Sequence, residues 1–392
     1  MLAIVLLIVV DVATLGVLLL VGLYCLELML AVLPWPETTR VEPLSRLRFA
    51  VLIPAHNEQA ILGRTLKALI PTLGPNDRVL VVAENCTDST ATVARQAHAE
   101  VIELHDPSRR GKGYAIDFGL EHLQADSPDG VVFLDADCQV DSDTVLTLGT
   151  SAVTMRRPAQ GMTFTDADPD ATPAQTTSHL AMRFKYLVRA LGLSRLTGLC
   201  YLTDTTVALP WSLTYNFRLA DDQAVDEAQL GLDLTVAGTP PLLVPHAWVT
   251  RPWRQRSDQA GMSQSSLESN YFRTLLTQVP RLFCQGLTRG RPDVVGLSVD
   301  LAIPPLPLLA AVWLLTLTAA LACVPMGATA WPALLLMLGG GGLILSVTAG
   351  WFFHCRKQIS LRDLCGALFH VLSPSAANRA AAEAASRRGA AG

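Results

Sequence analysis

The sequence has few charged residues. Only 16% of its 392 residues are Asp, Glu, Lys or Arg, half are hydrophobic, and the mean hydropathy is +0.35. Soluble domains usually carry about a quarter charged residues, so this deficit indicates a membrane protein. The net charge is −4 and no long basic run is present, which excludes nucleic acid from the expected partners.

Paired cysteines are also missing. The eight cysteines include no Cys-x-x-Cys pair, and none stands with histidines at the spacing of a zinc site. Neither a disulfide framework nor a zinc site is therefore expected. Isolated thiols of this kind are typical of a reducing compartment.

The sequence has instead three long apolar stretches. Residues 1–34 are almost wholly apolar, and residues 303–324 and 331–353 contain no charged side chain. Each stretch is long enough to cross a bilayer, which takes about 20 residues. A cleaved signal peptide fits the first stretch poorly, because no Lys or Arg precedes it and the apolar run is too long. Asp11 and Glu27 interrupt that run, and we expect them near an interface or against another helix.

Basic residues flank these stretches on one side. The flanking residues are Arg40, Arg46, Arg48, Arg289, Arg291, Arg356, Lys357 and Arg362. With three spans, the positive-inside rule places them in the cytoplasm and the N-terminus outside. We therefore predict a transmembrane helix over 1–34, a cytoplasmic domain over 35–300, a transmembrane hairpin over 301–355 and a partly disordered cytoplasmic tail over 356–392.

Residues 49–150 alternate between strand and helix patterns. The apolar patterns predict strands over 49–54, 78–83, 100–104 and 131–134, and helices over 58–69, 88–97 and 113–123. Such alternation predicts an α/β fold with a mostly parallel sheet flanked by helices. In these folds the ligand lies beyond the carboxyl ends of the strands.

Two carboxylates follow the last of these strands. Val131–Leu134 leads directly into Asp135-Ala136-Asp137. Residues i and i+2 of a strand point the same way, so both carboxylates are expected to face one point beyond the strand. Paired oxygens there suit Mg²⁺ or Mn²⁺ carrying a phosphorylated substrate. The Asp-x-Asp motif alone also occurs by chance in loops, so its neighbours decide its meaning.

Three further polar blocks stand where other elements of the same predicted sheet end or begin. They are Pro54-Ala55-His56-Asn57-Glu58, Glu84-Asn85-Cys86-Thr87-Asp88 and Arg109-Arg110-Gly111-Lys112-Gly113. Taken singly, each has a structural explanation as a helix cap, a turn or a solvated surface. Taken together at one sheet edge, they predict a diphosphate site, because cations beside a Gly-rich helix start suit phosphate groups.

Residues 151–300 are less regular. Asp166–Asp170 has the composition of a solvated turn. Helices are predicted over 179–191 and 228–236. Ser263–Leu287 mixes Leu, Phe and Tyr with scattered Arg, which fits interfacial helices near 263–290 lying on the membrane surface and equally fits an ordinary packing face.

The four blocks resemble those of the membrane-anchored bacterial family 2 glycosyltransferases, which have the GT-A fold. The resembling text, from Val51 to about Pro245, includes VLIPAHNEQAILGRTL, RVLVVAENCTDSTATVA, RRGKGYAIDFGL, VVFLDADC, ALPW and LGLDLTVAG. The resemblance implies a nucleotide-diphospho-sugar donor, with a UDP-sugar as first choice, and Mg²⁺ or Mn²⁺ as cofactor. It also implies inverting transfer to the hydroxyl of a glycan or lipid-linked acceptor.

The resemblance also implies roles for single residues. Carried over position by position, it implies that the Pro54–Glu58 block and Glu84 hold the nucleoside and that Lys112 lies near the nucleotide. It further implies that Asp135 and Asp137 flank the diphosphate, with Asp137 on the metal.

The acceptor side departs from the family pattern. The family's Glu-Asp before a Leu-Gly-Leu helix reads Asp226-Glu227 here, so Glu227 occupies the position of the base and Asp226 is the alternative. An acidic helix start explains the same pair without catalysis. Glu84-Asn85 replaces the Asp-Asn of the subgroup. The family's Gln-x-x-Arg-Trp motif is absent after Gln264, which argues against a processive enzyme.

We therefore predict an active, metal-dependent, non-processive glycosyltransferase of the hexosyltransferase type. It would act at the inner face of a bacterial cytoplasmic membrane, in surface-polysaccharide or glycolipid synthesis. The alternative is a non-catalytic subunit that binds sugar nucleotide as a partner or regulator. The intact Asp135, Asp137 and Lys112 favour activity, whereas the altered acceptor motifs favour the alternative.

Overall fold

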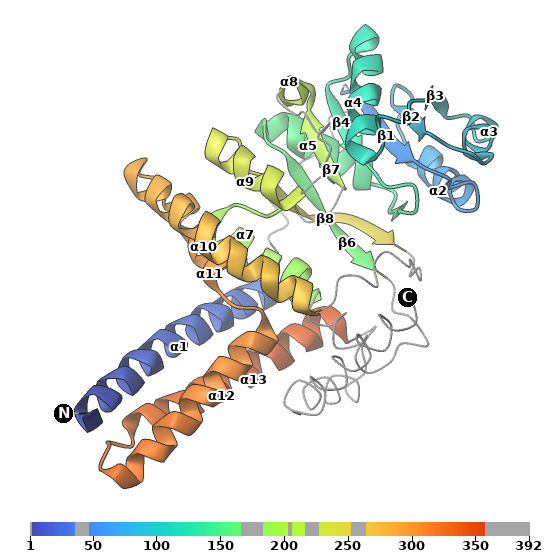
Figure 1. Cartoon of the computed structure of the whole chain (residues 1–392). Coiled ribbons are helices and arrows are strands. Elements are labelled where there is room, and N and C mark those ends of the chain that lie inside the picture. Colours follow the sequence, from blue (N-terminus) through green and yellow to red (C-terminus); the bar gives the residue numbers. More distant parts are fainter. Residues whose placement is uncertain are drawn as a thin grey trace, which may run out of the picture. The chain divides into compact units, whose positions relative to one another are not determined.

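The computed structural model describes residues 2–35, 47–165, 183–202, 206–215, 227–251 and 264–356. The chain forms two compact units. The first unit holds the described strands and the helices that cover them, and the second holds the long apolar helices and their companions (Figure 1). Asp166–Asp170, Asp226 and the tail after residue 356 lie outside the described residues.

An eight-stranded sheet forms the first unit. Its strands are β1 (Phe49–Ala55), β2 (Arg78–Glu84), β3 (Glu100–Leu104), β4 (Gly130–Phe133), β5 (Gln139–Val140), β6 (Ala159–Thr165), β7 (Val207–Pro210) and β8 (Leu242–Arg251). They lie in the order β3-β2-β1-β4-β7-β6-β8-β5. The first four are parallel, β7 is antiparallel to β4 and β6, and β8 is parallel to β6 but antiparallel to β5. The predicted α/β fold with a mostly parallel sheet is confirmed.

Alternate residues of β1 supply the two cores of this unit. Val51 and Ile53 pack on the face covered by α2 (Leu62–Leu69), α3 (Thr90–Gln96) and α5 (Thr144–Met155). Ala50 and Leu52 pack on the opposite face, covered by α4 (Lys112–Leu123) and α9 (Glu227–Ala237). A strand buried on both faces reads as a continuous apolar run, which is the pattern that the sequence shows.

The elements predicted over residues 49–150 match the observed ones within a few residues, with one exception. The helix predicted from Glu58 begins only at Leu62. The backbone N–H groups of Glu58 and Gln59 instead donate to Thr90 Oγ1 at 2.8 Å and Asp88 Oδ2 at 3.1 Å. These bonds hold the segment after β1 against the segment after β2, so the helix starts one turn later.

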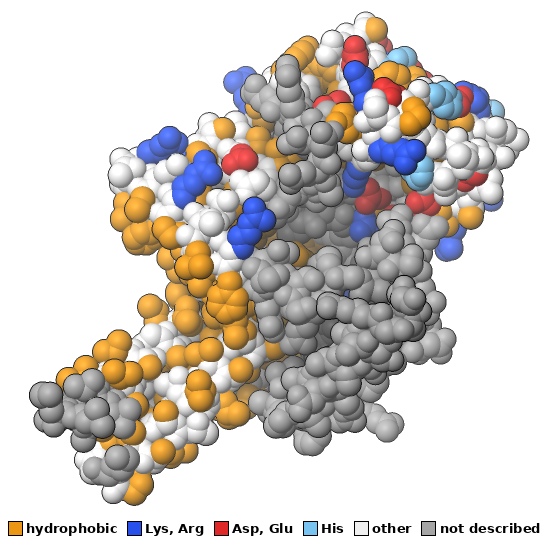
Figure 2. Space-filling view, in the orientation of Figure 1, with side chains coloured by type: hydrophobic (Ala, Val, Ile, Leu, Met, Phe, Trp, Pro, Cys, Tyr) orange, Lys and Arg blue, Asp and Glu red, His pale blue; other side chains and the backbone are white. Residues whose placement is uncertain are grey.

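Within the described residues, the second unit contains three helices that are long and apolar enough to cross a membrane. They are α1 (Leu2–Val32), α12 (Leu306–Cys323) and α13 (Trp331–Gly350), the last continued by a π-helical turn to Cys355. α1 packs against both α12 and α13 (Figure 1), and hydrophobic side chains cover these helices (Figure 2). The second span begins at Leu306 and not at the predicted residue 303, because Pro305 has extended backbone angles that end the preceding turn.

Further helical elements belong to the second unit. They are a π-helical turn (Phe184–Val188), α7 (Arg189–Thr197), α10 (Gln264–Thr288) and α11 (Pro292–Ala302). α10 packs against α11, which the sequence did not predict as a separate helix. α7 packs closely on α1, because a Cβ added at Gly192 would lie 2.2 Å from the carbonyl oxygen of Glu27.

A buried charge cluster ties these helices together. Arg189 Nε donates to Glu27 Oε2 at 2.8 Å, and Arg189 Nη2 donates to Asp300 Oδ1 at 2.6 Å. The Arg189 guanidinium also lies 5.3 Å from the ring centre of Tyr24. Glu27, which interrupts the first apolar stretch, therefore faces other helices as the sequence led us to expect.

Candidate active site

Asp135 and Asp137 lie just beyond β4, at the carboxyl edge of the sheet. β4 ends at Phe133, so the two aspartates belong to the turn between β4 and β5 and not to a strand. The expectation that strand alternation aligns the two carboxylates was therefore wrong. The turn aligns them instead: the Cys138 N–H donates to the Asp135 carbonyl at 3.1 Å, and Thr65 Oγ1 of α2 donates to the Ala136 carbonyl at 2.7 Å.

The side chains after β4 fit a hard divalent cation. Ligand atoms of Asp135, Asp137 and Cys138 all lie within 4.8 Å of one another. Two carboxylates suit Mg²⁺ or Mn²⁺, which take their remaining ligands from water and from substrate phosphates. The Cys138 thiol is a softer ligand and is not needed for such a site. Asp135 and Asp137 are thus the residues that would hold the metal.

Two cations contact this carboxylate pair. Lys112 Nζ, at the first residue of α4, donates to Asp135 Oδ1 at 2.6 Å. Arg251 Nη2 donates to Asp135 Oδ2, and Arg251 Nε lies 3.4 Å from Asp137 Oδ1. The site therefore holds two cations and two carboxylates, and it lies beside the N-terminus of α4, where backbone N–H groups favour anions.

Arg251 was not among the predicted site residues. It is the last residue of β8, which pairs antiparallel with β5 in the register Gln139↔Thr250. Extending that register by one residue sets Arg251 opposite Cys138, beside the two aspartates. A pairing between residues more than 100 positions apart leaves no local pattern in the sequence, so no signal of this kind could have identified Arg251.

Glu84 and Asn85 organise the loop that leads to Lys112. Glu84 is buried at the end of β2, and its Oε1 accepts from the Gly111 N–H at 3.2 Å and from Asn85 Nδ2 at 2.9 Å. Asn85 Nδ2 also donates to the carbonyls of Asp106 and Arg109. Gly111 has a φ of 113°, a conformation that favours glycine. The resemblance assigns Glu84 to the nucleoside, and in the structure its carboxylate accepts hydrogen bonds that shape the loop leading to Lys112.

The block after β1 is bonded to the block after β2. Pro54 and Ala55 are the last residues of β1, and Glu58 is buried. His56 Nδ1 lies 2.7 Å from the Glu84 carbonyl oxygen, and Asn57 Oδ1 accepts from the Thr87 N–H at 2.8 Å. The structure thus brings Pro54–Glu58 and Glu84 to one sheet edge with Lys112, Asp135 and Asp137.

The surroundings shift the pKa values of two side chains in the Glu84–Asp88 block, Cys86 and Asp88. Burial raises the pKa of the Cys86 thiol, which favours its protonated form at neutral pH. The pKa of Asp88 shifts the other way. Partial burial alone would raise this pKa, but hydrogen bonds from the hydroxyl and N–H of Thr90 and from the Gln59 N–H have the larger combined effect and lower it. Asp88 therefore stays ionised and fixes the start of α3.

The acceptor side is only partly described. Glu227 is the first residue of α9, as its assignment as a helix-start carboxylate requires, and its side chain is not described. Asp226 lies outside the described residues. Gln264 begins α10, and its side chain is likewise not described.

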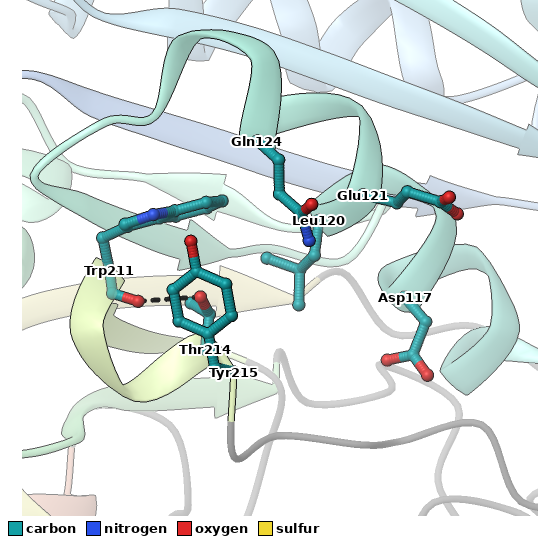
Figure 3. A pocket seen from close by; sticks show the side chains of 7 residues that line it. All are labelled: Asp117, Leu120, Glu121, Gln124, Trp211, Thr214 and Tyr215. Atoms are coloured by element: carbon teal, nitrogen blue, oxygen red, sulfur yellow. Dashed lines mark hydrogen bonds between the residues drawn. The ribbon is translucent and has the colours of Figure 1, made fainter.

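A separate hollow of about 310 Å³ lies at the opposite edge of the sheet. Figure 3 shows the rings of Trp211 and Tyr215 near Gln124, the residue that follows α4, and the hydrogen bond from the Thr214 hydroxyl to the Trp211 carbonyl. Trp211 begins the short helix α8 (Trp211–Thr214) after Pro210, which pairs with Gly130 at the amino end of β4. The hollow is therefore distinct from the site at Asp135, and it contains neither of the two aspartates.

Comparison with known proteins agrees with this geometry. Residues 50–152 match the family model described as glycosyl transferase family 2. A probable glycosyltransferase of Bacillus subtilis, YdaM, is 30% identical over 100 residues, which are 24% of this chain and 23% of that protein. The 4,4'-diaponeurosporenoate glycosyltransferase of Staphylococcus aureus is 34% identical over 90 residues, 22% of this chain and 23% of that protein. The matched region thus spans about a quarter of the length of these curated relatives.

A solved structure matches nearly the whole chain. The mannosyltransferase PcManGT of Pyrobaculum calidifontis, in complex with GDP-Man and Mn²⁺, aligns with a TM-score of 0.51 at 18% identity, covering 94% of this chain and 98% of that one. At this identity the likeness establishes the fold. The family model match over residues 50–152 and this likeness in fold agree with the resemblance to family 2 glycosyltransferases and with the GT-A fold that the sequence motifs implied.

Proposed function

We propose that the protein is a membrane-bound, inverting glycosyltransferase that moves a sugar from a nucleotide-diphospho-sugar, preferably a UDP-sugar, to an acceptor hydroxyl. The acceptor is a glycan or a lipid-linked molecule, and transfer is non-processive, in surface-polysaccharide or glycolipid synthesis. The observation that carries the proposal is the meeting of Asp135, Asp137 and Lys112 at the carboxyl edge of the sheet, beside the N-terminus of α4. This combination suits a metal-bound diphosphate.

The residues divide the reaction into a donor half and an acceptor half. Asp135 and Asp137 hold Mg²⁺ or Mn²⁺, which neutralises charge on the leaving diphosphate when bound. The acceptor oxygen attacks the anomeric carbon from the face opposite the diphosphate, and the bond from that carbon to the diphosphate oxygen breaks. The acceptor proton passes to the carboxylate of Glu227 or Asp226, and the electron pair of the broken bond leaves with the nucleoside diphosphate.

One experiment tests the donor half. The full chain, purified in detergent or nanodiscs, is assayed for nucleotide release from UDP- and GDP-sugars with Mn²⁺ or Mg²⁺. We expect Asp137→Ala to lower release about 100- to 1000-fold, in line with about 2.7–4 kcal/mol for one lost electrostatic contact to the transition state. Asp126→Ala is the matched control, because Asp126 lies on the surface at the other sheet edge, where its carboxylate accepts from Arg48 and Arg78. Full activity in Asp137→Ala would refute the metal assignment.

A second comparison tests the base. Glu227→Gln and Asp226→Asn remove one negative charge each while keeping the side-chain size. Loss of a general base costs about 100- to 10,000-fold in rate, so the two variants should differ sharply. Equal and mild losses would remove both residues from the role of base.

The alternative, a non-catalytic subunit, makes a different prediction. It binds sugar nucleotide through the same residues but releases no nucleoside diphosphate with any donor or acceptor. Ordinary donor binding by calorimetry together with no turnover would favour this alternative over the enzyme.

We further propose that the chain is anchored in the bacterial inner membrane by helices within 1–34 and 301–355, with residues 35–300 and the tail 356–392 in the cytoplasm. The three apolar helices and the distribution of basic residues support this arrangement. A topology reporter fused to the C-terminus should read as cytoplasmic, and a periplasmic reading would overturn the orientation.

The same proposal places α10 on the membrane surface. Phe272, Leu276, Phe283 and Leu287 are exposed and recur at helical spacing along one stripe of α10. Exposed Arg273 and Arg281 lie along the same helix, and Figure 2 shows basic side chains beside hydrophobic ones there. Such a helix suits an interface with anionic headgroups. A fluorophore at Leu276→Cys should be quenched by headgroup-labelled lipids, whereas one at Arg95→Cys should not.

A further inference from the structure

We propose that Arg251, together with Lys112, is an internal counter-cation of the metal site, and that this makes metal and nucleoside diphosphate bind cooperatively. This inference rests on the proposed donor site and adds a mode of regulation to it. Arg251 would change partners, from the two aspartates without donor to the diphosphate oxygens with donor.

The geometry shows that the carboxylate oxygens are already engaged. Lys112 Nζ lies 2.6 Å from Asp135 Oδ1, and Arg251 Nη2 bonds the other oxygen of the same carboxylate. Arg251 Nε lies 3.4 Å from Asp137 Oδ1. Both oxygens of Asp135 and one oxygen of Asp137 thus face protein cations, and these are the oxygens that the two aspartates would offer to a divalent metal.

The charge balance explains why the two ligands would need each other. Two carboxylates offset Lys112 and Arg251, so a divalent metal alone would enter a locally neutral site and meet two cations at close range. A diphosphate brings negative charge that can accept Arg251 and Lys112, which frees the aspartate oxygens for the metal. Arginine suits this exchange because its planar fork of N–H donors matches carboxylate and phosphate oxygens alike.

The place of Arg251 in the chain suits such an exchange. It is the terminal residue of β8, and its neighbour Thr250 is held by the pairing with Gln139 of β5. The backbone is therefore fixed beside the aspartates, and a change of partner would require only rotations about the side-chain torsions of Arg251. The backbone of Lys112 is held by α4, of which it is the first residue, and its ammonium group contacts the other oxygen of the Asp135 carboxylate.

Metal binding measured without turnover tests this proposal. Mn²⁺ affinity of the full chain in detergent is measured by electron paramagnetic resonance, first alone and then with saturating UDP or GDP. In the wild type, we expect nucleotide to raise the Mn²⁺ affinity at least tenfold. In Arg251→Gln, we expect Mn²⁺ alone to bind about tenfold more tightly than in the wild type, because a competing charge is gone. The factor by which nucleotide raises the Mn²⁺ affinity should be smaller in this variant than in the wild type, also by about tenfold, since coupling between two ligands is reciprocal.

Two further variants sharpen the result. Arg251→Lys keeps the positive charge but lacks the planar set of N–H donors of arginine. Mn²⁺ alone should therefore still bind weakly, and nucleotide should raise the Mn²⁺ affinity by less than in the wild type. Arg95→Gln is the matched control, because Arg95 is an exposed arginine on α3 that pairs with Glu103. It should leave every Mn²⁺ affinity unchanged.

The outcomes separate this inference from the proposed function. If UDP and GDP both couple to Mn²⁺ in the wild type and the coupling is unchanged in Arg251→Gln, the counter-cation role is refuted while the donor site stands. If neither nucleotide binds, the donor proposal fails, yet tighter Mn²⁺ binding in Arg251→Gln would still support the counter-cation role. Weaker Mn²⁺ binding in Arg251→Gln would refute it.

Discussion

Two arginine–carboxylate clusters, one in each unit, can be compared, because in each of them a single arginine contacts two carboxylates. Arg251 contacts Asp135 and Asp137 beside the sheet, and Arg189 contacts Glu27 and Asp300 among the helices. Their surroundings differ: the Asp135 side chain is 22% exposed, whereas that of Glu27 is 3% exposed. One arginine–carboxylate cluster is therefore partly exposed to solvent, and the other is almost fully buried.

The difference in burial assigns different roles to the two clusters. A buried charge without a partner is very costly, so Arg189 and its carboxylates hold one another permanently. Burial opposes the charge of Arg189, but Asp300 and Glu27 outweigh it and raise its pKa, which keeps the guanidinium charged at any physiological pH. The cluster at Asp135 can reach water and has a second cation in Lys112, so its contacts can be exchanged for a ligand. We therefore infer that one cluster fixes the helices, whereas the other provides the proposed metal and diphosphate site.

The largest expected effect comes from removing each arginine in turn. Arg189→Met leaves Glu27 and Asp300 buried without their cation, which should destabilise the chain by about 3–5 kcal/mol. Arg251→Met leaves partly exposed carboxylates that still face Lys112, and should cost about 1 kcal/mol or less. Thermal unfolding in detergent, followed by intrinsic fluorescence, measures the difference.

Arg95→Met provides the baseline for an exposed arginine on the surface of the same chain. Equal melting temperatures for Arg189→Met and Arg251→Met would mean that burial does not separate the two clusters, and the comparison would fail.

The contact between α7 and α1 gives the next largest effect. A Cβ at Gly192 would lie 2.2 Å from the Glu27 carbonyl oxygen and 2.8 Å from its Cα, which are both backbone atoms. Gly192→Ala should therefore push α7 away from α1, strain the Arg189–Glu27 pair and cost about 1–3 kcal/mol. Gly16→Ala in α1 is the control, because nothing lies within 4 Å of its added Cβ. It should be neutral or slightly stabilising, and a similar loss in both variants would contradict a specific contact at Gly192.

Local patterns explain what the sequence could predict. The strands and helices of residues 49–150 follow from apolar runs and from turns between them, and these signals span only a few residues. The Asp135–Asp137 pair and the Glu84 and Lys112 blocks were predicted at one sheet edge because parallel strands present their carboxyl ends together. The three apolar helices were equally visible, since length and composition define them.

Pairings between distant residues explain what the sequence could not predict. Arg251 reaches Asp135 only through the register of β8 with β5, and Arg189 reaches Glu27 across 162 positions of sequence. The antiparallel half of the sheet, built by β5 to β8, likewise depends on contacts that no local period encodes. The alignment of Asp135 with Asp137 was expected for a wrong reason, because a turn held by Thr65 replaces the strand that we assumed.

The smallest predicted effect tests whether that turn positions the exchangeable cluster. Thr65→Val keeps the volume of a buried side chain but removes its hydrogen bond to the Ala136 carbonyl, and should cost about 1 kcal/mol of stability. Thr72→Val is the matched control, because Thr72 Oγ1 donates to the Leu69 carbonyl at 2.7 Å, away from the aspartates. Both variants should lower the melting temperature slightly, but only Thr65→Val should also weaken Mn²⁺ binding in the presence of nucleotide. If the two variants bind Mn²⁺ equally, the turn sets stability alone and the metal site owes its shape to Lys112 and Arg251.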